Sequence, residues 1–286
     1  MEDIKKTTAT KAQGANPGEQ PAGDAAQAQQ STAKKPAAKK PAAKKRKSNL
    51  RAIEMYYTPV FDVSLNMAIN YYTSLRINDP KMGVLQPHSF IPVAQKSNRI
   101  FELGKWAVEE GCDAILRCEK RSADINCLIL DIAVKHMSRH YFAGQMLKMV
   151  NEKGVSPEKF CFNLNESILE KDKENILKNI KQLREDGFLI SIDDFGVEYT
   201  SLSHLGQYDV DYISLNKSLL DGIQENERSQ DMLQGIIDFA KKIGAKTRIG
   251  GVDNKELAEL LKKMGVDQMY GKAYGGPRKE RSIRVS

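Results

Sequence analysis

The sequence contains no stretch of 18 apolar residues, so no membrane span is expected. The opening residues, MEDIKKTTATKAQG, also lack the apolar centre of a secretory signal. Cysteine is scarce, and its four copies form no CxxC pair and have no histidine at zinc spacing. These absences argue against membrane-spanning, disulfide-rich and zinc-stabilised classes. We therefore expect a protein of the reducing cytoplasm.

Aromatic residues are absent from the first 48 positions, where Ala, Lys, Gln, Pro and Thr dominate. Such a composition buries too little apolar surface to fold alone. The same 48 residues carry eleven basic and four acidic side chains, which accounts for the whole net charge of +7. We predict a disordered basic tail over residues 1–48, followed by one folded domain over residues 49–286.

The tail repeats the unit KKPAA, which clusters positive charge and places a proline at every fifth position. Proline blocks a continuous helix and lysine repulsion extends the chain, so the segment suits polyanions without reading their sequence. Nucleic acid is the first expectation, an anionic membrane surface is another, and a solvated spacer without a partner is the simplest alternative. The basic residues concerned are Lys34, Lys35, Lys39, Lys40, Lys44, Lys45, Arg46 and Lys47.

Strand-like and helix-like segments alternate through the rest of the chain, as judged from β-branched and aromatic enrichment and from apolar residues at helical spacing. A helical region over 89–119 is interrupted near Ser97, and Asp253 with Glu256 resembles a capping box. The other expected helices are 140–152, 173–186, a short one near Ser201, helical material between 215 and Lys242, and 254–264. The expected strands are 56–63, 68–77, 126–134, 159–165, 188–195, 210–215, 247–252 and 268–271.

This alternation predicts an α/β fold, a closed (β/α)8 TIM-like barrel. An open doubly wound sheet is the alternative, but no GxGxxG follows an early strand. Function in a barrel lies where strands end, and LISIDDFGVEYTSL puts Asp193 and Asp194 there. Adjacent carboxylates repel each other. A metal site and a strand end whose acids cap the next segment both remain open at this point.

Several segments, in order, resemble the EAL domain family, the bacterial phosphodiesterases that linearise cyclic di-GMP. SIDDFGVEYTSL looks like the family's DDFG segment, TRIGGVDN like its AEGVE strand end, YGKAYGGP like its closing segment, and residues 56–95 like its opening strands. A protein kinase, which also carries DFG, is excluded because no glycine-rich loop or HRD segment is present. The resemblance covers residues 50–280 and implies an EAL-type barrel.

The family's chemistry requires two divalent cations that activate a water. At the first cation, the resemblance aligns Tyr72 with a glutamate, Asp131 with an asparagine and Asn163 with a glutamate, while Asp193 is unchanged. A phenol is a poor Mg²⁺ ligand because it stays protonated at neutral pH. We expect no bound metal, with Asp131, Asp193 and Asp194 as vestigial ligands. Mg²⁺ or Mn²⁺ is expected only if activity is retained.

Other catalytic positions differ as well. Gly250 replaces a glutamate, Ser214 a lysine, Asn216 an aspartate and Tyr270 a glutamine, and Asp253 shortens a second glutamate. Loss of a general base alone costs about 10²- to 10⁴-fold in rate. No catalytic residue is therefore predicted in this chain.

Some family features survive. Leu75 and Arg76 match a pair whose arginine reaches the nucleotide phosphate, so these two residues with Asp193 and Asp194 are the predicted nucleotide-binding set. Glu166 matches an acid that holds the loop after DDFG. The resemblance also implies a homodimer as one option.

Three functions from different classes follow from these features. The favoured one is a catalytically inactive EAL-like domain that acts as a protein-interaction, scaffolding or regulatory module. Its basic tail would tether it to nucleic acid or another polyanion, and its protein partner is unidentified. The second is a cyclic di-GMP receptor that binds without cleaving. The third is a residual phosphodiesterase.

Overall fold

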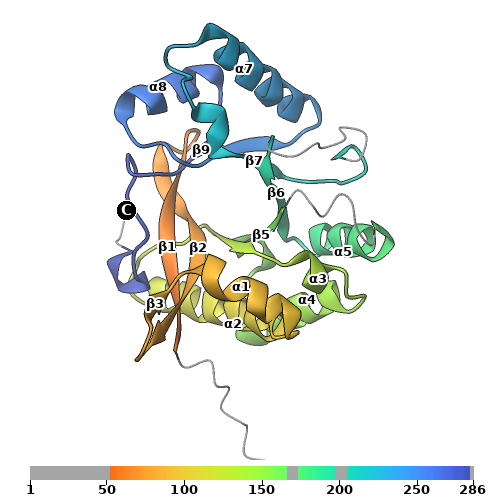
Figure 1. The fold of residues 1–286 in the computed structure, drawn as a ribbon. Coiled ribbons are helices and arrows are strands. Elements are labelled where there is room, and N and C mark those ends of the chain that lie inside the picture. The colour runs from red at the N-terminus through yellow and green to blue at the C-terminus, as the bar shows by residue number, and fades with distance from the viewer. Residues whose placement is uncertain (1–51, 166–172, 197–204, 284–286) are drawn as a thin grey trace, which may run out of the picture. The chain divides into compact units, whose positions relative to one another are not determined.

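The computed structural model describes residues 52–165, 173–196 and 205–283, all within one compact unit that spans Ser48–Ser286 (Figure 1). Eight strands close into a barrel, and helices cover its outside. The barrel strands are β1 (Ile53–Asp62), β2 (Met67–Asp79), β4 (Cys127–Asp131), β5 (Phe160–Asn165), β6 (Leu189–Phe195), β7 (Tyr212–Leu215), β8 (Lys246–Ile249) and β9 (Gln268–Met269). This architecture confirms the predicted TIM-like barrel.

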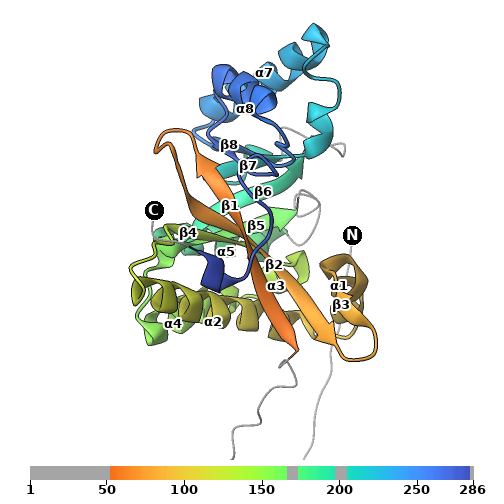
Figure 2. The same cartoon turned by 90° about the vertical axis from the view of Figure 1, so that its left-hand side faces the viewer.

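One strand departs from an all-parallel (β/α)8 barrel. The barrel strands β2, β4, β5, β6, β7, β8 and β9 run parallel, whereas β1 is antiparallel to both of its neighbours, β2 and β9. Only residues 63–66 connect β1 to β2, and a parallel connection needs a crossover of a dozen or more residues. Figure 2 shows the long β1–β2 pair running past the shorter strands, with β3 (Gly83–Leu85) at one end.

The α-helices lie in the connections between strands. The interruption expected near Ser97 separates α1 from α2, and Asn98 there has a left-handed φ of 57°. Asn254 caps α8 by accepting a hydrogen bond from the Leu257 amide at 2.8 Å, so the cap lies one residue after the expected Asp253. The helices are α1 (Pro87–Lys96), α2 (Ile100–Glu119), α3 (Val134–Met137), α4 (Phe142–Lys153), α5 (Lys173–Glu185), α7 (Glu227–Lys242) and α8 (Lys255–Met264).

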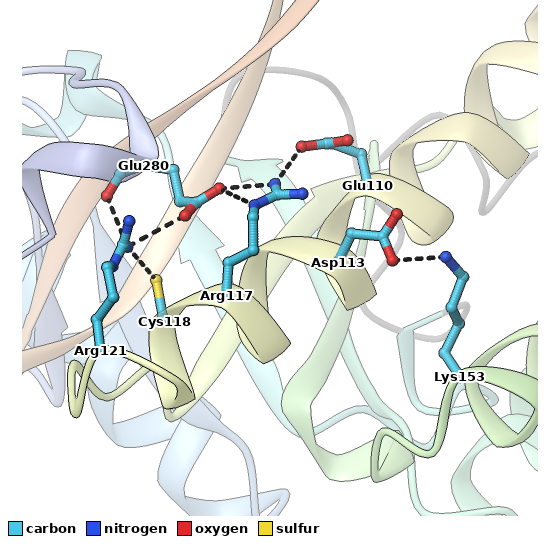
Figure 3. A network of polar contacts seen from close by, with 7 residues as sticks. All are labelled: Glu110, Asp113, Arg117, Cys118, Arg121, Lys153 and Glu280. Carbon is cyan, nitrogen blue, oxygen red and sulfur yellow. Dashed lines mark hydrogen bonds and ion pairs between the residues drawn. The ribbon is translucent and has the colours of Figure 1, made fainter.

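The outer face of α2 holds the C-terminal part of the chain through ion pairs (Figure 3). The carboxylate of Glu280, in the short 3-10 helix η4 (Glu280–Ser282), pairs with Arg117 at 2.6 Å and with Arg121 at 3.1 Å. On the same helix, Asp113 pairs with Lys153 of α4 at 2.5 Å. These contacts tie α2 both to the next helix and to the end of the chain.

The barrel interior contains a buried polar group. The guanidinium of Arg248, which is 1% exposed, donates to Gln268 Oε1 at 3.0 Å and lies 4.5 Å from the centre of the Tyr212 ring. Side chains two residues apart on a strand share a face. The residues two positions after Arg248 and Gln268 are Gly250 and Tyr270, so the interior continues towards the carboxyl ends of the strands, which we call the mouth of the barrel.

No helix within the described part of the chain is both long and apolar enough to cross a membrane.

Candidate functional site

Four polar side chains from neighbouring strands converge at the mouth. The Tyr72 hydroxyl of β2 donates to Asp131 Oδ1 at 2.5 Å and lies 3.2 Å from Asp193 Oδ2. Asn163 of β5 donates through Nδ2 to Asp131 at 2.9 Å and to the Tyr72 oxygen at 3.2 Å. These are the four residues that the resemblance aligns with the ligands of the first cation. Their polar atoms surround the Tyr72 hydroxyl.

Burial and mutual repulsion set the charges of this group. Asp131 reaches solvent through the mouth, yet protein encloses it closely enough that desolvation, followed by the charge of Asp193, raises its pKa to about 6. Burial and then the charge of Asp194 raise the pKa of Asp193. Burial, and after it the charge of Asp131, raises the pKa of Tyr72 well above its ordinary value. The phenol is therefore neutral at physiological pH and acts as a hydrogen-bond donor.

A second tyrosine fills the adjoining space. The rings of Tyr72 and Tyr270 are stacked, with centroids 5.4 Å apart and planes 18° from parallel. A Cβ placed on Gly250 would lie 2.4 Å from Cζ and 2.6 Å from the hydroxyl oxygen of Tyr270. No side chain at position 250 can therefore coexist with the ring of Tyr270 in this position.

The other acid of the pair is held separately. Asp194 has a left-handed φ of 58° and accepts a hydrogen bond from Asn216 Nδ2 at 2.8 Å. Left-handed backbone is uncommon outside glycine, with Asp and Asn enriched among the exceptions. This conformation turns Asp194 towards the end of β7.

Two cavities meet at Asp131, Asp193 and Asp194. The first has a volume of about 460 Å³ and extends from these acids to α1 and the start of α2. The second, of about 380 Å³, is lined by the Tyr72 and Tyr270 side chains and by residues that follow β7 and β8. The acids thus form a partition between an apolar cavity and a more polar one.

The structure brings some of the predicted site residues together and not others. Leu75 and the acids Asp131, Asp193 and Asp194 all line the first cavity. Arg76 lines neither cavity; its guanidinium carbon lies 4.0 Å from the centre of the Tyr56 ring. Glu166 lies outside the described residues, as does the short helix expected near Ser201. So do the eight basic residues predicted to bind polyanions, which are Lys34, Lys35, Lys39, Lys40, Lys44, Lys45, Arg46 and Lys47.

Sequence reasoning noticed Tyr72, Gly250 and Tyr270 only as separate departures from the family pattern. Their packing against one another was missed. The available signal was the coincidence of a large residue gained at 270 with a side chain lost at 250, at neighbouring strand ends.

Comparison with known proteins agrees with this geometry. The EAL domain family matches residues 43–277. Oxygen sensor protein DosP of Escherichia coli is 24% identical over 225 residues, which cover 79% of this chain and 28% of DosP. Signaling protein YkoW of Bacillus subtilis is 25% identical over 227 residues, which cover 78% of this chain and 28% of YkoW. This chain therefore spans less than a third of these curated relatives.

Solved structures share the fold. PaMucR phosphodiesterase in complex with c-di-GMP superposes with a TM-score of 0.75 at 20% identity, covering 82% of this chain and 95% of PaMucR. The FimX EAL domain of Pseudomonas aeruginosa bound to c-di-GMP gives 0.74 at 15% identity, covering 82% of this chain and 94% of FimX. The match to the family extends over most of the sequence, and the barrel agrees with it. The chain belongs to the EAL domain family, whose members act in cyclic di-GMP signalling.

Proposed function

We propose that this chain is a catalytically inactive EAL domain that acts as a protein-interaction and regulatory module. The observation that carries the proposal is the pair of stacked tyrosines at the mouth. The Tyr72 hydroxyl is surrounded by the remaining first-cation positions, and the Tyr270 ring covers Gly250, where the family has a glutamate.

The residues present do not fit a two-cation centre. Hard divalent cations need several carboxylate or carbonyl oxygens that are free to converge on the metal. Here Asp131, Asp193 and Asn163 are already joined through a neutral phenol, whose proton a cation would have to displace. Gly250 supplies no donor. Among the described residues, no group of three or more His, Cys, Asp or Glu side chains is arranged to hold a metal ion.

Electrostatics also disfavour the family's nucleotide. Cyclic di-GMP carries two phosphates, and the three carboxylates at the mouth would repel them. Arg76, the predicted phosphate ligand, would have to leave the face of Tyr56 to reach the cavity. We therefore favour a protein partner over the nucleotide.

A non-hydrolysing cyclic di-GMP receptor is the second candidate. The 460 Å³ cavity beside Leu75 favours it because it leaves space at the mouth, and structures of PaMucR and FimX contain the nucleotide. A residual phosphodiesterase that depends on Mg²⁺ or Mn²⁺ is the least favoured reading.

Two measurements on the full chain separate these functions. The first is calorimetric titration with cyclic di-GMP, and the second is incubation with the nucleotide and Mg²⁺ or Mn²⁺ followed by chromatography for the linear product. We expect neither heat nor product, because the cation positions are blocked and the mouth is acidic. PaMucR phosphodiesterase is the positive control.

If cyclic di-GMP binds saturably at micromolar concentration and no linear product forms, the receptor function would be favoured over the interaction module. Metal-dependent formation of the linear dinucleotide would overturn the proposal altogether.

We further propose that the basic tail binds nucleic acid and tethers the domain to it. Eight of its eleven basic residues lie within positions 34–47, where each bound phosphate would release counterions.

A further inference from the structure

The 460 Å³ cavity combines an apolar wall with an acidic end. Leu75, Ile91, Pro92, Ile100 and Ile132 are among its apolar lining residues. Asp131, Asp193 and Asp194 line the same cavity. Among the described residues, neither lysine nor arginine lines it. A cavity of this kind is complementary to a molecule with an apolar body and one positive end.

Lys96 and Arg99 adjoin the lining residues Gln95 and Ile100 in sequence but do not line the cavity. Two other basic side chains close in sequence to this lining are engaged elsewhere. Arg76 packs on Tyr56, and Lys135 donates through Nζ to the backbone oxygen of Gln95 at 3.0 Å. Lys217 lines the second cavity, on the other side of the acids. The protein therefore leaves the acidic end of the first cavity without a counter-charge of its own among these groups.

An independent observation at Asn163 indicates what the cavity lacks. Asn163 is 2% exposed and lines the cavity. Its Nδ2 donates to both Asp131 and the Tyr72 oxygen, which fixes the orientation of the amide. Its Oδ1 is buried and has no hydrogen-bond partner within the described part of the chain. A buried acceptor without a donor is costly, so this end of the cavity calls for a ligand that donates hydrogen bonds.

We propose that this cavity binds one organic cation, an ammonium or guanidinium group on an apolar stem, supplied by a lysine or arginine side chain of the partner protein. The cationic group would donate to Asp131, Asp193 and Asn163 Oδ1, and its stem would lie along the apolar wall. Hydrogen bonds between ionised groups are shorter and stronger than neutral ones. The inference rests on the proposed interaction function and names the chemistry of the partner.

The test uses probes that share a phenyl stem and carry a positive, a neutral or a negative end group. Full-length protein is titrated with 4-phenylbutylamine, 4-phenylbutanol and 4-phenylbutyrate, and binding is followed by ligand-observed NMR. We expect the amine to bind about tenfold more tightly than the alcohol, and the acid not to bind. N-acetylarginine methylamide and its citrulline counterpart repeat the comparison for a protein side chain, and the arginine compound is expected to bind more tightly.

Three variants locate the site. Asp193→Asn removes one carboxylate and should weaken amine binding about tenfold, whereas Asp124→Asn, an exposed acid before the opposite end of β4, should leave it unchanged. Ala133→Leu leaves every acid in place but puts a larger side chain into the apolar part of the cavity. This variant should abolish binding of the phenyl stem. This variant keeps the proposal testable if Asp193→Asn fails to fold.

Equal binding of amine and alcohol, or full amine binding by a folded Asp193→Asn or Ala133→Leu protein, would overturn the inference. Displacement of the amine by millimolar Mg²⁺ would also overturn it, because the acids would then be a metal site. A failed amine titration leaves the hydrolysis assay untouched, so failure of this inference is distinguishable from failure of the proposed function.

Discussion

At the scale of single residues, the contact between Gly250 and Tyr270 decides the shape of the mouth. Gly250→Ala would place a Cβ 2.4 Å from the Tyr270 ring, and such overpacking costs typically about 1–3 kcal/mol. We expect the free energy of unfolding, measured with urea, to fall by that amount.

Two further variants make this prediction specific. Gly276→Ala is the matched control, because a Cβ there meets no atom of the described residues within 4 Å. In a Tyr270→Ala background, Gly250→Ala should cost much less, since the ring it strikes is gone. Additive costs in the double variant would show that the two positions do not interact.

Much of the mouth was predictable residue by residue, but its packing was not. Asp131, Asp193 and Asp194 lie towards the carboxyl ends of predicted strands, and these ends meet at one edge of a barrel. That Tyr72 stacks on Tyr270 depends on two side chains almost 200 positions apart filling one volume. A pattern within one strand carries no information about such a contact. The unpartnered oxygen of Asn163 is likewise a property of its neighbours and not of its own segment.

At the scale of elements, Glu280 joins η4 to α2. Its side chain is 14% exposed, and its carboxylate pairs with both Arg117 and Arg121. Glu280→Gln should lower the free energy of unfolding by about 1–2 kcal/mol, because hydrogen bonds to charged groups are worth more than neutral ones. Limited proteolysis should also cut the C-terminal segment faster in this variant.

An exposed ion pair provides the control for this prediction. Glu152 pairs with Lys148 at 3.8 Å, and both side chains are more than half exposed. Glu152→Gln should change stability by less than about 0.5 kcal/mol, as is usual for exposed pairs on a helix. Equal effects at Glu152 and Glu280 would mean that η4 is not held by its ion pairs.

The type of each element could be predicted from local sequence patterns. The direction of the strands and the residues that cap the helices also depend on tertiary contacts. The interruption between α1 and α2 was predicted near Ser97, and the structure places it there. The short strand β3 has only three residues and no alternation to reveal it. The cap of α8 falls on Asn254, although Asp253 has the same capacity; neighbouring Asp253 instead pairs with Lys272 at 2.9 Å. Such competition between partners is settled by tertiary contacts.

At the scale of the whole molecule, charge is divided between a basic tail and a formally neutral remainder. We expect the full chain to retard DNA or RNA in gels, and its affinity to fall steeply with salt. If about six basic residues contact phosphates, the affinity should drop about 10³-fold between about 50 and 200 mM salt. Deletion of residues 1–48 should abolish retardation.

Replacing lysines by uncharged glutamine distinguishes the contribution of the KKPAA repeat to binding from that of the rest of the tail. Glutamine in place of Lys34, Lys35, Lys39 and Lys40 should remove more binding than glutamine in place of Lys5, Lys6 and Lys11. If the protein without residues 1–48 still retards nucleic acid, the barrel binds it. The proposal that the tail tethers the domain would then be wrong.

The pairing of β1 with β9, the first and last strands of the barrel, limits the order in which this chain can fold as it leaves the ribosome. β1 can pair with β2 as soon as both have emerged, but Phe61 and Asp62 find their other partners only in Met269 and Gln268 of β9. Gln268 and Asp62 are 206 positions apart, and pairings this distant close slowly. Until the last strand arrives, the outer edge of β1 stays open to strands of other nascent chains. Aggregation during synthesis should therefore begin at this unpaired edge of β1.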